Sequence, residues 1–487
     1  MFGAGTNIAR LGAGTILLAI ALAGCGGGDA SEWTRANHDL GSTRTASSSS
    51  IDSETVTSLR PIWRHAVAID PPDSSGSLTA TPVVADETVY VQDMRSNVYA
   101  LRLDDGRLRW RHDIGFRNPG PNGLAIEDDR VYGVTDESVF ALDAADGRPV
   151  WSRRILTDVE YFVDIAPQVA GDRVFASTVG FAPRGRGALY ALDRHTGRTI
   201  WRFDTIKDPW RYPLEAGGGG AWNTPSVDGD DVFWGISNPT PWGGTRKRPN
   251  GGSFPGPALY TDSLVVTDAK TGALRWHDQV TPHDIRDYDF HLPPVLGDAD
   301  GEAAVFGAGK AGVVIAWSRE SRTRLWETQV GVHRNDHGPL PHELVDVCPG
   351  LYGGVETPMA LAGGRLFVPV VNLCSLGSAT GYEPLENVDP NDGTGLLVAL
   401  DPSDGSVAWQ RRLPLPVFGC ATVANDVVFT STFDGTIHAL HVEDGRTLWT
   451  GRTRAGINAC PAVVGDTLVV AAGIGRRAEI VAFATRR

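Results

Sequence analysis

The sequence of 487 residues is poor in several features that mark other classes of protein. It has three methionines and no long amphipathic run, which argues against a helical protein. Basic residues are the minority, 44 against 58 acidic ones, so the formal charge is −14. Because phosphate binding favours a basic surface, we expect no nucleic acid partner. The abundance of glycine (58) and proline (31) instead favours short strands and tight turns.

The N-terminus also lacks an apolar run long enough to span a bilayer comfortably. Arg10 precedes a short apolar segment that ends in Leu-Ala-Gly-Cys at Cys25, which resembles the lipobox of bacterial lipoproteins. We therefore expect residues 1–24 to be a signal peptide and Cys25 to be lipidated. Residues 25–58, rich in Gly, Ser and Thr, are expected to form a flexible linker. An ordinary secretory signal with a chance cysteine is the alternative.

These features predict an exported protein held at a membrane surface by acyl chains rather than by a helix. The anchor would lie at the outer face of the cytoplasmic membrane or in the periplasm or outer membrane.

One unit recurs along the rest of the chain. It joins an alternating strand, a Gly-containing turn and a Trp-containing strand, as in FALDAADGRPVW ending at Trp151 and LYALDRHTGRTIW ending at Trp201. This pattern is typical of a β-hairpin. A second strand pair recurs upstream, as in TPVVADETVYV from Thr81 and TPSVDGDDVFW from Thr224. Each unit thus carries four strands, which is one blade of a β-propeller.

The Trp strand occurs eight times, at Trp63, Trp110, Trp151, Trp201, Trp276, Trp326, Trp409 and Trp449. The first copy, PIWRHAV, has no preceding partner strands, and the last unit, which ends in EIVAFAT, has no Trp strand. The two halves complement one another. We therefore predict an all-β protein, an eight-bladed propeller over residues 59–487 that is closed by pairing of its N- and C-terminal strands. The tryptophans are expected to stack between blades.

Cysteine is scarce, and Cys348, Cys374, Cys420 and Cys460 remain once the lipobox cysteine is set aside. An even number in an oxidising compartment predicts disulfides. Cys420 and Cys460 hold the same position in consecutive repeats, so we expect Cys420–Cys460 and Cys348–Cys374. Free buried thiols are the alternative.

The run TPHDIRDYDFHLPPVL, residues 281–296, concentrates charge where the repeat needs only a loop. It contains His283, Asp284, Asp287, Asp289 and His291. A solvated loop would also explain this composition. Long insertions precede Trp276 and Trp409, and we expect function or partner contacts there because regular blades need only turns.

The Trp-terminated repeat resembles that of the eight-bladed quinoprotein alcohol dehydrogenases, which use pyrroloquinoline quinone (PQQ) and calcium. GGGGAWNTP is similar to the run with the family's stacking tryptophan, here Trp222, and ISNPTPW to the run with its calcium-binding asparagine, here Asn238. TPHDIRDYD places the catalytic aspartate at Asp287, and GAGKAGVVIAW places a quinone-contacting lysine at Lys310. The resemblance implies that Asp287 takes the substrate proton. Asp287 could itself also help to hold the metal, and it would then be a poorer base.

The resemblance implies a small alcohol or sugar as substrate. Because no haem-attachment Cys-x-x-Cys-His run is present, electrons would pass to a separate acceptor. Each matched residue has a plainer interpretation: blade packing for Trp222, a turn residue for Asn238, a solvated loop acid for Asp287 and a surface lysine for Lys310.

Four departures from the family pattern weaken the prediction. Residues 179–187, where the calcium-binding glutamate should fall, contain no acid. Arg286 replaces the family's tryptophan, Asn122 stands in place of its arginine, and the adjacent-cysteine pair is missing. Losing an anionic ligand should weaken calcium binding.

A non-catalytic propeller that binds a protein partner is therefore the second hypothesis. The outer-membrane protein assembly lipoprotein is similar in blade number, repeat and anchoring. A third possibility concerns VHRNDHGPLPHEL, whose histidines and acids could form a metal site if the segment were helical. Its prolines make a polar loop the preferred interpretation.

Overall fold

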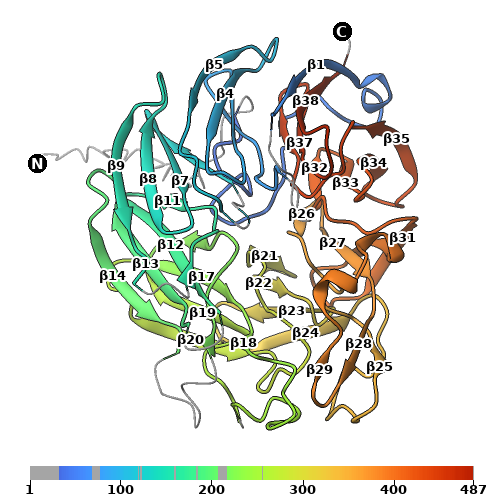
Figure 1. The fold of residues 1–487 in the computed structure, drawn as a ribbon. Coiled ribbons are helices and arrows are strands. Elements are labelled where there is room, and N and C mark those ends of the chain that lie inside the picture. Colours follow the sequence, from blue (N-terminus) through green and yellow to red (C-terminus); the bar gives the residue numbers. More distant parts are fainter. Residues whose placement is uncertain are drawn as a thin grey trace, which may run out of the picture.

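The structure is a computed structural model that describes residues 32–68, 77–118, 120, 123–157, 161–181, 185–206, 217–254 and 256–485. Its described residues form strands and three short 3₁₀ helices, and no α-helix occurs among them. The strands build eight antiparallel sheets that stand around one axis (Figure 1). The prediction of an all-β, eight-bladed propeller is thus confirmed. The signal peptide, Cys25 and Asn122 lie outside the described residues.

Each blade is a four-stranded meander whose first strand lies nearest the axis. The first four blades are blade 1, β2 (Val83–Ala85), β3 (Thr88–Gln92), β4 (Val98–Arg102) and β5 (Leu108–His112); blade 2, β6 (Ala125–Glu127), β7 (Arg130–Val134), β8 (Ser138–Asp143) and β9 (Pro149–Arg154); blade 3, β11 (Gln168–Ala170), β12 (Arg173–Gly180), β13 (Ala188–Asp193) and β14 (Thr199–Asp204); and blade 4, β16 (Ser226–Asp228), β17 (Asp231–Ile236), β19 (Ser263–Asp268) and β20 (Leu274–Gln279).

The remaining blades follow the same order. They are blade 5, β21 (Val295–Ala299), β22 (Glu302–Ala308), β23 (Val313–Ser318) and β24 (Arg324–Gln329); blade 6, β26 (Ala360–Ala362), β27 (Arg365–Asn372), β30 (Thr394–Leu400) and β31 (Val407–Leu413); blade 7, β32 (Thr422–Ala424), β33 (Val427–Ser431), β34 (Thr436–His441) and β35 (Thr447–Arg452); and blade 8, β36 (Ala462–Val464), β37 (Thr467–Ala472), β38 (Glu479–Ala484) and β1 (Arg60–Ala66).

Smaller elements lie within the connecting segments. β10 (Tyr161–Phe162) pairs with β12, β15 (Gly217–Gly218) pairs with β18 (Pro239–Thr240), and β25 (Val345–Val347), β28 (Ser375–Ser378) and β29 (Gly381–Tyr382) form a separate sheet. The 3₁₀ helices are η1 (Val56–Ser58), η2 (Leu385–Asn387) and η3 (Pro390–Asp392). The described parts of the two long insertions therefore carry short strands and 3₁₀ helices of their own.

The ring closes by pairing its two chain ends. β1 runs antiparallel to β38, so that Trp63 lies opposite Ala482 in the last blade. Figure 1 shows this blue strand beside the red one. Closure gives β38 a partner on each side and removes an exposed edge, as the sequence predicted.

Consecutive blades interlock through the repeated tryptophan and the repeated turn glycine. The Trp110 indole donates to the Ala144 carbonyl of the next blade at 2.9 Å, and an added Cβ at Gly147 would lie 2.5 Å from its ring. Six blade junctions share this arrangement, at glycines whose φ lies between 65° and 74°: Gly106, Gly147, Gly197, Gly272, Gly405 and Gly445. Only glycine satisfies both the positive φ and the close approach.

The expected flexible linker is a structured part of the propeller, so that prediction is wrong from residue 32 onward. Residues 33–50 run around the axis against the inner strands, and Trp33 and Arg44 are fully buried. Backbone hydrogen bonds join this segment to seven of the eight blades, at Val84, Ile126, Val227, Leu296, Leu361, Val423 and Gly465. A Ser/Thr-rich composition suits this position because hydroxyl groups and backbone can bond to the inner strands.

The buried Arg44 side chain explains part of this order. Its guanidinium donates to the carbonyls of Ala36 (2.7 Å), Ala421 (2.8 Å) and Pro461 (2.9 Å), so it ties the segment to blades 7 and 8. Such a group is costly to bury unless every donor has a partner.

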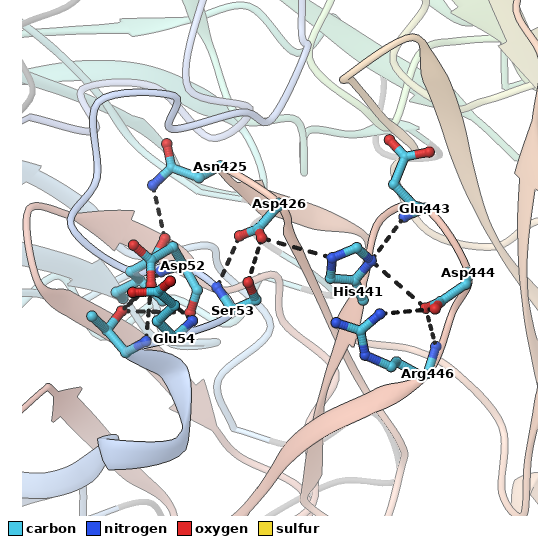
Figure 2. A network of polar contacts seen from close by, with 11 residues as sticks. Asp52, Ser53, Glu54, Asn425, Asp426, His441, Glu443, Asp444 and Arg446 are labelled. Atoms are coloured by element: carbon cyan, nitrogen blue, oxygen red, sulfur yellow. Dashed lines mark hydrogen bonds and ion pairs between the residues drawn. The ribbon is translucent and has the colours of Figure 1, made fainter.

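Further along, the segment is held on the turns of blade 7, as Figure 2 shows. The Ser53 amide donates to Asp426 at 2.8 Å, and the Asn425 side chain donates to the carbonyls of Ser49 (2.6 Å) and Ile51 (2.8 Å). His441 lies between Asp426 and Asp444 at 3.8 and 3.6 Å. Residues up to 58 therefore belong to the folded domain, whose boundary precedes the expected residue 59.

The disulfides join the pairs that the sequence suggested, Cys348–Cys374 and Cys420–Cys460. Cys420 and Cys460 directly precede the inner strands of blades 7 and 8, which are the same blades that Arg44 connects. Among the described residues, no helix is both long and apolar enough to cross a membrane.

The interlock can be tested with a pair of glycines that differ in one respect. Gly147→Ala and Gly171→Ala both place alanine at positive φ, but only the first brings its Cβ against a tryptophan, since Gly171 has nothing within 4 Å. We expect Gly147→Ala to lower the free energy of unfolding by about 1–3 kcal/mol more than Gly171→Ala, because a packed ring must move. Urea unfolding measures both, and equal losses would contradict the interlock.

Candidate functional site

The meander order brings two kinds of connection to one end of the propeller. In every blade, the link from the outer strand to the next inner strand and the link between the second and third strands lie at the same end. Asp287 lies on the first kind, between β20 and β21, whereas Asn238 and Lys310 lie on the second kind, after β17 and after β22. Residues of blades 4 and 5 that are distant in sequence therefore meet here.

The centre of the site is a buried ammonium held between two carboxylates. Lys310 Nζ lies 2.9 Å from Asp287 Oδ2 and 2.8 Å from Asp289 Oδ2. The Asn238 side chain donates to Asp287 Oδ1 at 2.6 Å, and its backbone amide donates to Asp289 Oδ1 at 2.9 Å. All four residues are buried. The solvated-loop and surface-lysine interpretations of Asp287 and Lys310 are therefore wrong.

The loop is shaped by its first carboxylate. Asp284 accepts hydrogen bonds from the backbone amides of Arg286 (2.7 Å) and Tyr288 (2.8 Å), which folds the turn around Asp287. Asp287 itself has a φ of 67°, a strained conformation for a residue with a side chain. Arg286 turns away from the cluster and donates to the carbonyls of Asn335, His337 and Gly338.

Burial sets the electrostatics of the cluster. Burial and Asp289 raise the pKa of Asp287 above its usual value, while Lys310 opposes this shift. Burial alone would lower the pKa of Lys310, but Asp287 and Asp289 outweigh it and raise that pKa. Burial also raises the pKa of Asp284 to about 6. A carboxylate whose pKa is raised is a stronger base once it is ionised, and the charged lysine favours that ionised form.

An aromatic surface adjoins the charged cluster. Lys310 Nζ lies 5.3 Å from the Trp222 ring centroid, and the His291 ring lies 5.5 Å from the same indole. Burial lowers the pKa of His291, which favours the neutral imidazole. A cavity of about 250 Å³ on the axis has Trp222, His291, Asp164, Glu356 and the Cys420–Cys460 disulfide among its lining groups, with Ala36 and Asn37 of the N-terminal segment.

Glu356 is a site residue that the sequence interpretation missed. The preceding segment is pressed against the lysine loop: Val355 donates to the Gly309 carbonyl at 3.1 Å, and a Cβ at Gly354 would lie 2.1 Å from the Lys310 carbonyl oxygen. Burial raises the pKa of Glu356 to about 7, against the opposing charge of Lys310. The available signal was an acid directly before the Thr-Pro that opens an inner strand, where other repeats have Ala or Asn.

The structure brings Trp222, Asn238, Asp287 and Lys310 into one cluster. It also adds Asp289, which lies in the run of residues 281–296 and had no role assigned from the sequence. The segment at 179–187, where an acid was missing, is described at Val179–Phe181 and from residue 185, and Ala182, Pro183 and Arg184 lie outside the described residues. In the other cluster, Asp336 bonds His333 at 2.8 Å and His337 at 2.9 Å on an irregular loop. No three His, Cys, Asp or Glu residues within the described ranges are grouped to hold a metal.

The site lies within a segment that matches a known protein family. The model of the glucose/ethanol/alcohol dehydrogenase β-propeller domain matches residues 33–331, which include Trp222, Asn238, Asp287 and Lys310. The chain belongs to this family. A second model, that of the outer membrane protein assembly factor BamB, matches residues 310–486. The resemblance to a quinoprotein alcohol dehydrogenase propeller is thereby confirmed.

Individual relatives agree with this assignment. The quinoprotein-type propeller is 28% identical to the quinohemoprotein alcohol dehydrogenase of Comamonas testosteroni, over 94% of this chain and 74% of that protein. The structural match to the crystal structure of the same enzyme covers 93% of this chain and 80% of that chain, with a TM-score of 0.81. A 1-butanol dehydrogenase (cytochrome c) of Thauera butanivorans is 24% identical over 94% of this chain and 75% of that protein.

A europium-containing methanol dehydrogenase shares the fold at 20% identity, with a TM-score of 0.77 over 94% of this chain and 98% of that one.

The raised pKa of Glu356 predicts a pH-dependent stability. Its pKa rises from 4.5 unfolded to about 7 folded, so the folded state is penalised as pH rises through this window. We expect Glu356→Gln to stabilise the protein by about 1–3 kcal/mol at pH 8 and to lose that gain at pH 4. Urea unfolding at both pH values measures the effect. The exposed Glu386→Gln is the control, and a gain that does not change with pH would contradict the prediction.

Proposed function

We propose that this protein is a PQQ-dependent alcohol dehydrogenase whose reaction takes place at Asp287. The observation that carries the proposal is the buried cluster in which Lys310 lies between Asp287 and Asp289 beside the Trp222 indole. Family membership supports it, as do relatives that are named as alcohol dehydrogenases.

The residues present fit the quinone. PQQ is a planar tricarboxylate, and Trp222 offers an aromatic surface with a cationic nitrogen above it. Two buried polar atoms near the cluster, Glu356 Oε1 and Tyr382 Oη, have no hydrogen-bond partner among the described residues, which is expected of groups that face a ligand.

Charge balance favours a multivalent cation as well. Asp287, Asp289 and Glu356 all act on the one buried lysine, and a tricarboxylate would add further negative charge. Asn238 and the two carboxylates of Asp287 and Asp289 supply the oxygen donors that hard cations prefer. The candidates are calcium and, given the europium-containing neighbour, a trivalent lanthanide. The carboxylate of Asp289 offsets the acid missing from residues 179–187.

In the proposed reaction, PQQ and the cation supply the hydride acceptor and its polarisation. Asp287 takes the proton of the substrate hydroxyl at a carboxylate oxygen. Lys310 stabilises the ionised form of Asp287 before the transfer, and the Asn238 amide fixes the carboxylate orientation. Asp284 keeps the loop in the strained conformation that presents Asp287.

A separate acceptor would take the electrons. A cytochrome c is the class that the 1-butanol dehydrogenase relative suggests. The match of residues 310–486 to BamB supports a second candidate, a non-catalytic propeller that binds a protein partner.

Titration of PQQ into the protein separates these two functions. We expect tryptophan quenching and calorimetric binding with calcium or a lanthanide, and a loss of at least about tenfold in affinity with chelator or in Asn238→Ala. Dye-coupled alcohol oxidation should fall by about 10²–10⁴ in Asp287→Asn, because the base is removed. Asp346→Asn, at an exposed residue, is the matched control. If no cation supports binding at high micromolar PQQ, the PQQ-dependent function is overturned.

We also propose that the protein is exported and lipid-anchored at Cys25. The support is the short apolar segment followed by Leu-Ala-Gly-Cys. In a bacterial host, the protein should enter the detergent phase and carry an acylated N-terminal cysteine by mass spectrometry, and Cys25→Ser should abolish both. Cleavage at another position without acylation would contradict the proposal.

A further inference from the structure

Tyr382 reaches the site from the second long insertion. It ends the β28–β29 hairpin, where it pairs with Gly377. The ring packs so closely that an added Cβ would approach it to 2.6 Å at Gly377 and to 3.1 Å at Gly243. Glycines from both insertions thus hold the tyrosine in one position. A side chain held this firmly can present its hydroxyl with little loss of conformational entropy.

The tyrosine side chain packs beside the catalytic loop. Tyr382 packs in one apolar cluster with Ile285, the residue between Asp284 and Arg286. Burial raises the pKa of Tyr382, the charge of Asp284 adds to this shift, Arg286 opposes it, and Asp287 adds a smaller contribution. The ring is half-buried while its oxygen is fully buried, so the hydroxyl is the inward end of the side chain.

This hydroxyl has no hydrogen-bond partner within the described ranges. Other buried tyrosine hydroxyls bond to the protein: Tyr90 to Ala144, Tyr99 to Asp93, Tyr190 to Ile155 and Tyr288 to Pro349. A buried hydroxyl without a partner is costly, and phenylalanine would fill the same space without that cost. The hydroxyl is therefore explained if a bound molecule supplies its partner.

We propose that Tyr382 Oη binds a second oxygen of the substrate, so that the site prefers alcohols with a further hydroxyl or ether oxygen, such as diols, polyols and alkoxy alcohols, over plain aliphatic alcohols. This rests on the proposed function, because the first oxygen is the hydroxyl that reacts at Asp287. A site built to bond a substrate oxygen discriminates against the analogue that lacks it, because its own polar group is then left unpaired.

The test compares pairs of alcohols of equal length in which one ether oxygen replaces a methylene. The pairs are 2-methoxyethanol with 1-butanol, 3-methoxypropan-1-ol with 1-pentanol, and 4-methoxybutan-1-ol with 1-hexanol. For at least one pair, we expect kcat/KM of the ether to exceed that of the alkanol by about tenfold. In Tyr382→Phe this ratio should fall toward one, mainly through KM of the ether.

Tyr90→Phe is the matched control, since its hydroxyl bonds within blades 1 and 2, and it should keep the wild-type ratio. Saturation-transfer NMR without turnover provides a binding readout, in which the ether signal should weaken in Tyr382→Phe relative to the alkanol. A Tyr382→Phe variant that slows both members of each pair equally would show a structural role and overturn the inference. Absence of PQQ binding and of turnover with every alcohol would instead overturn the proposed function.

Discussion

The contact that holds most of the ring together is the one between a blade's tryptophan and the turn glycine of the next blade, which occurs at six of the eight blade junctions. Its indole N–H donates to a backbone carbonyl of that neighbour, and its ring covers the space a Cβ would take. A hydrogen bond of this kind contributes about 1 kcal/mol, and the contact recurs around the ring. It fixes blade 5 against blade 6, and at the junction of blades 4 and 5 the contacts of Asp287 with Asn238 and Lys310 join the two blades. The loops at this end, where residues of blades 4, 5 and 6 meet, are thereby held together.

Those loops bring together more negative charge than the protein alone can neutralise. Lys310 serves both Asp287 and Asp289, while Asp262, with no exposed surface, adds a carboxyl whose pKa is raised by burial and then by Asp284, Asp289 and Asp287. An interior with several acids around one ammonium is stable only if some acids hold protons or a cation enters. Burial, with a further contribution from Asp289, raises the pKa of Asp287 against the opposing charge of Lys310 and so strengthens this carboxylate as a base.

The sequence could predict what the repeat itself encodes. Three features follow from the position of equivalent residues in the repeated unit. They are the number of blades, the closure of β1 on β38 and the disulfide between equivalent positions of consecutive blades. The four residues to which the family resemblance pointed, Trp222, Asn238, Asp287 and Lys310, also lie together in the structure. Asp289 and Glu356 were missed because their importance comes from proximity to Lys310 across blades. The supposed linker was misjudged because composition cannot show that Arg44 finds partners in residues more than 370 positions away.

The N-terminal segment limits the directions from which a ligand can reach the site. It crosses the inner strands of the blades, and its residues Ala36 and Asn37 line the axial cavity that Trp222 also lines. Because this segment occupies part of the axis, we expect a ligand of Asp287 to approach from the end of the propeller that carries the loops of blades 4, 5 and 6. The two insertions stand at that end, and their glycines position Tyr382. The conserved geometry of a propeller can thus fix the reacting groups, while additions to two blades decide which molecules reach them.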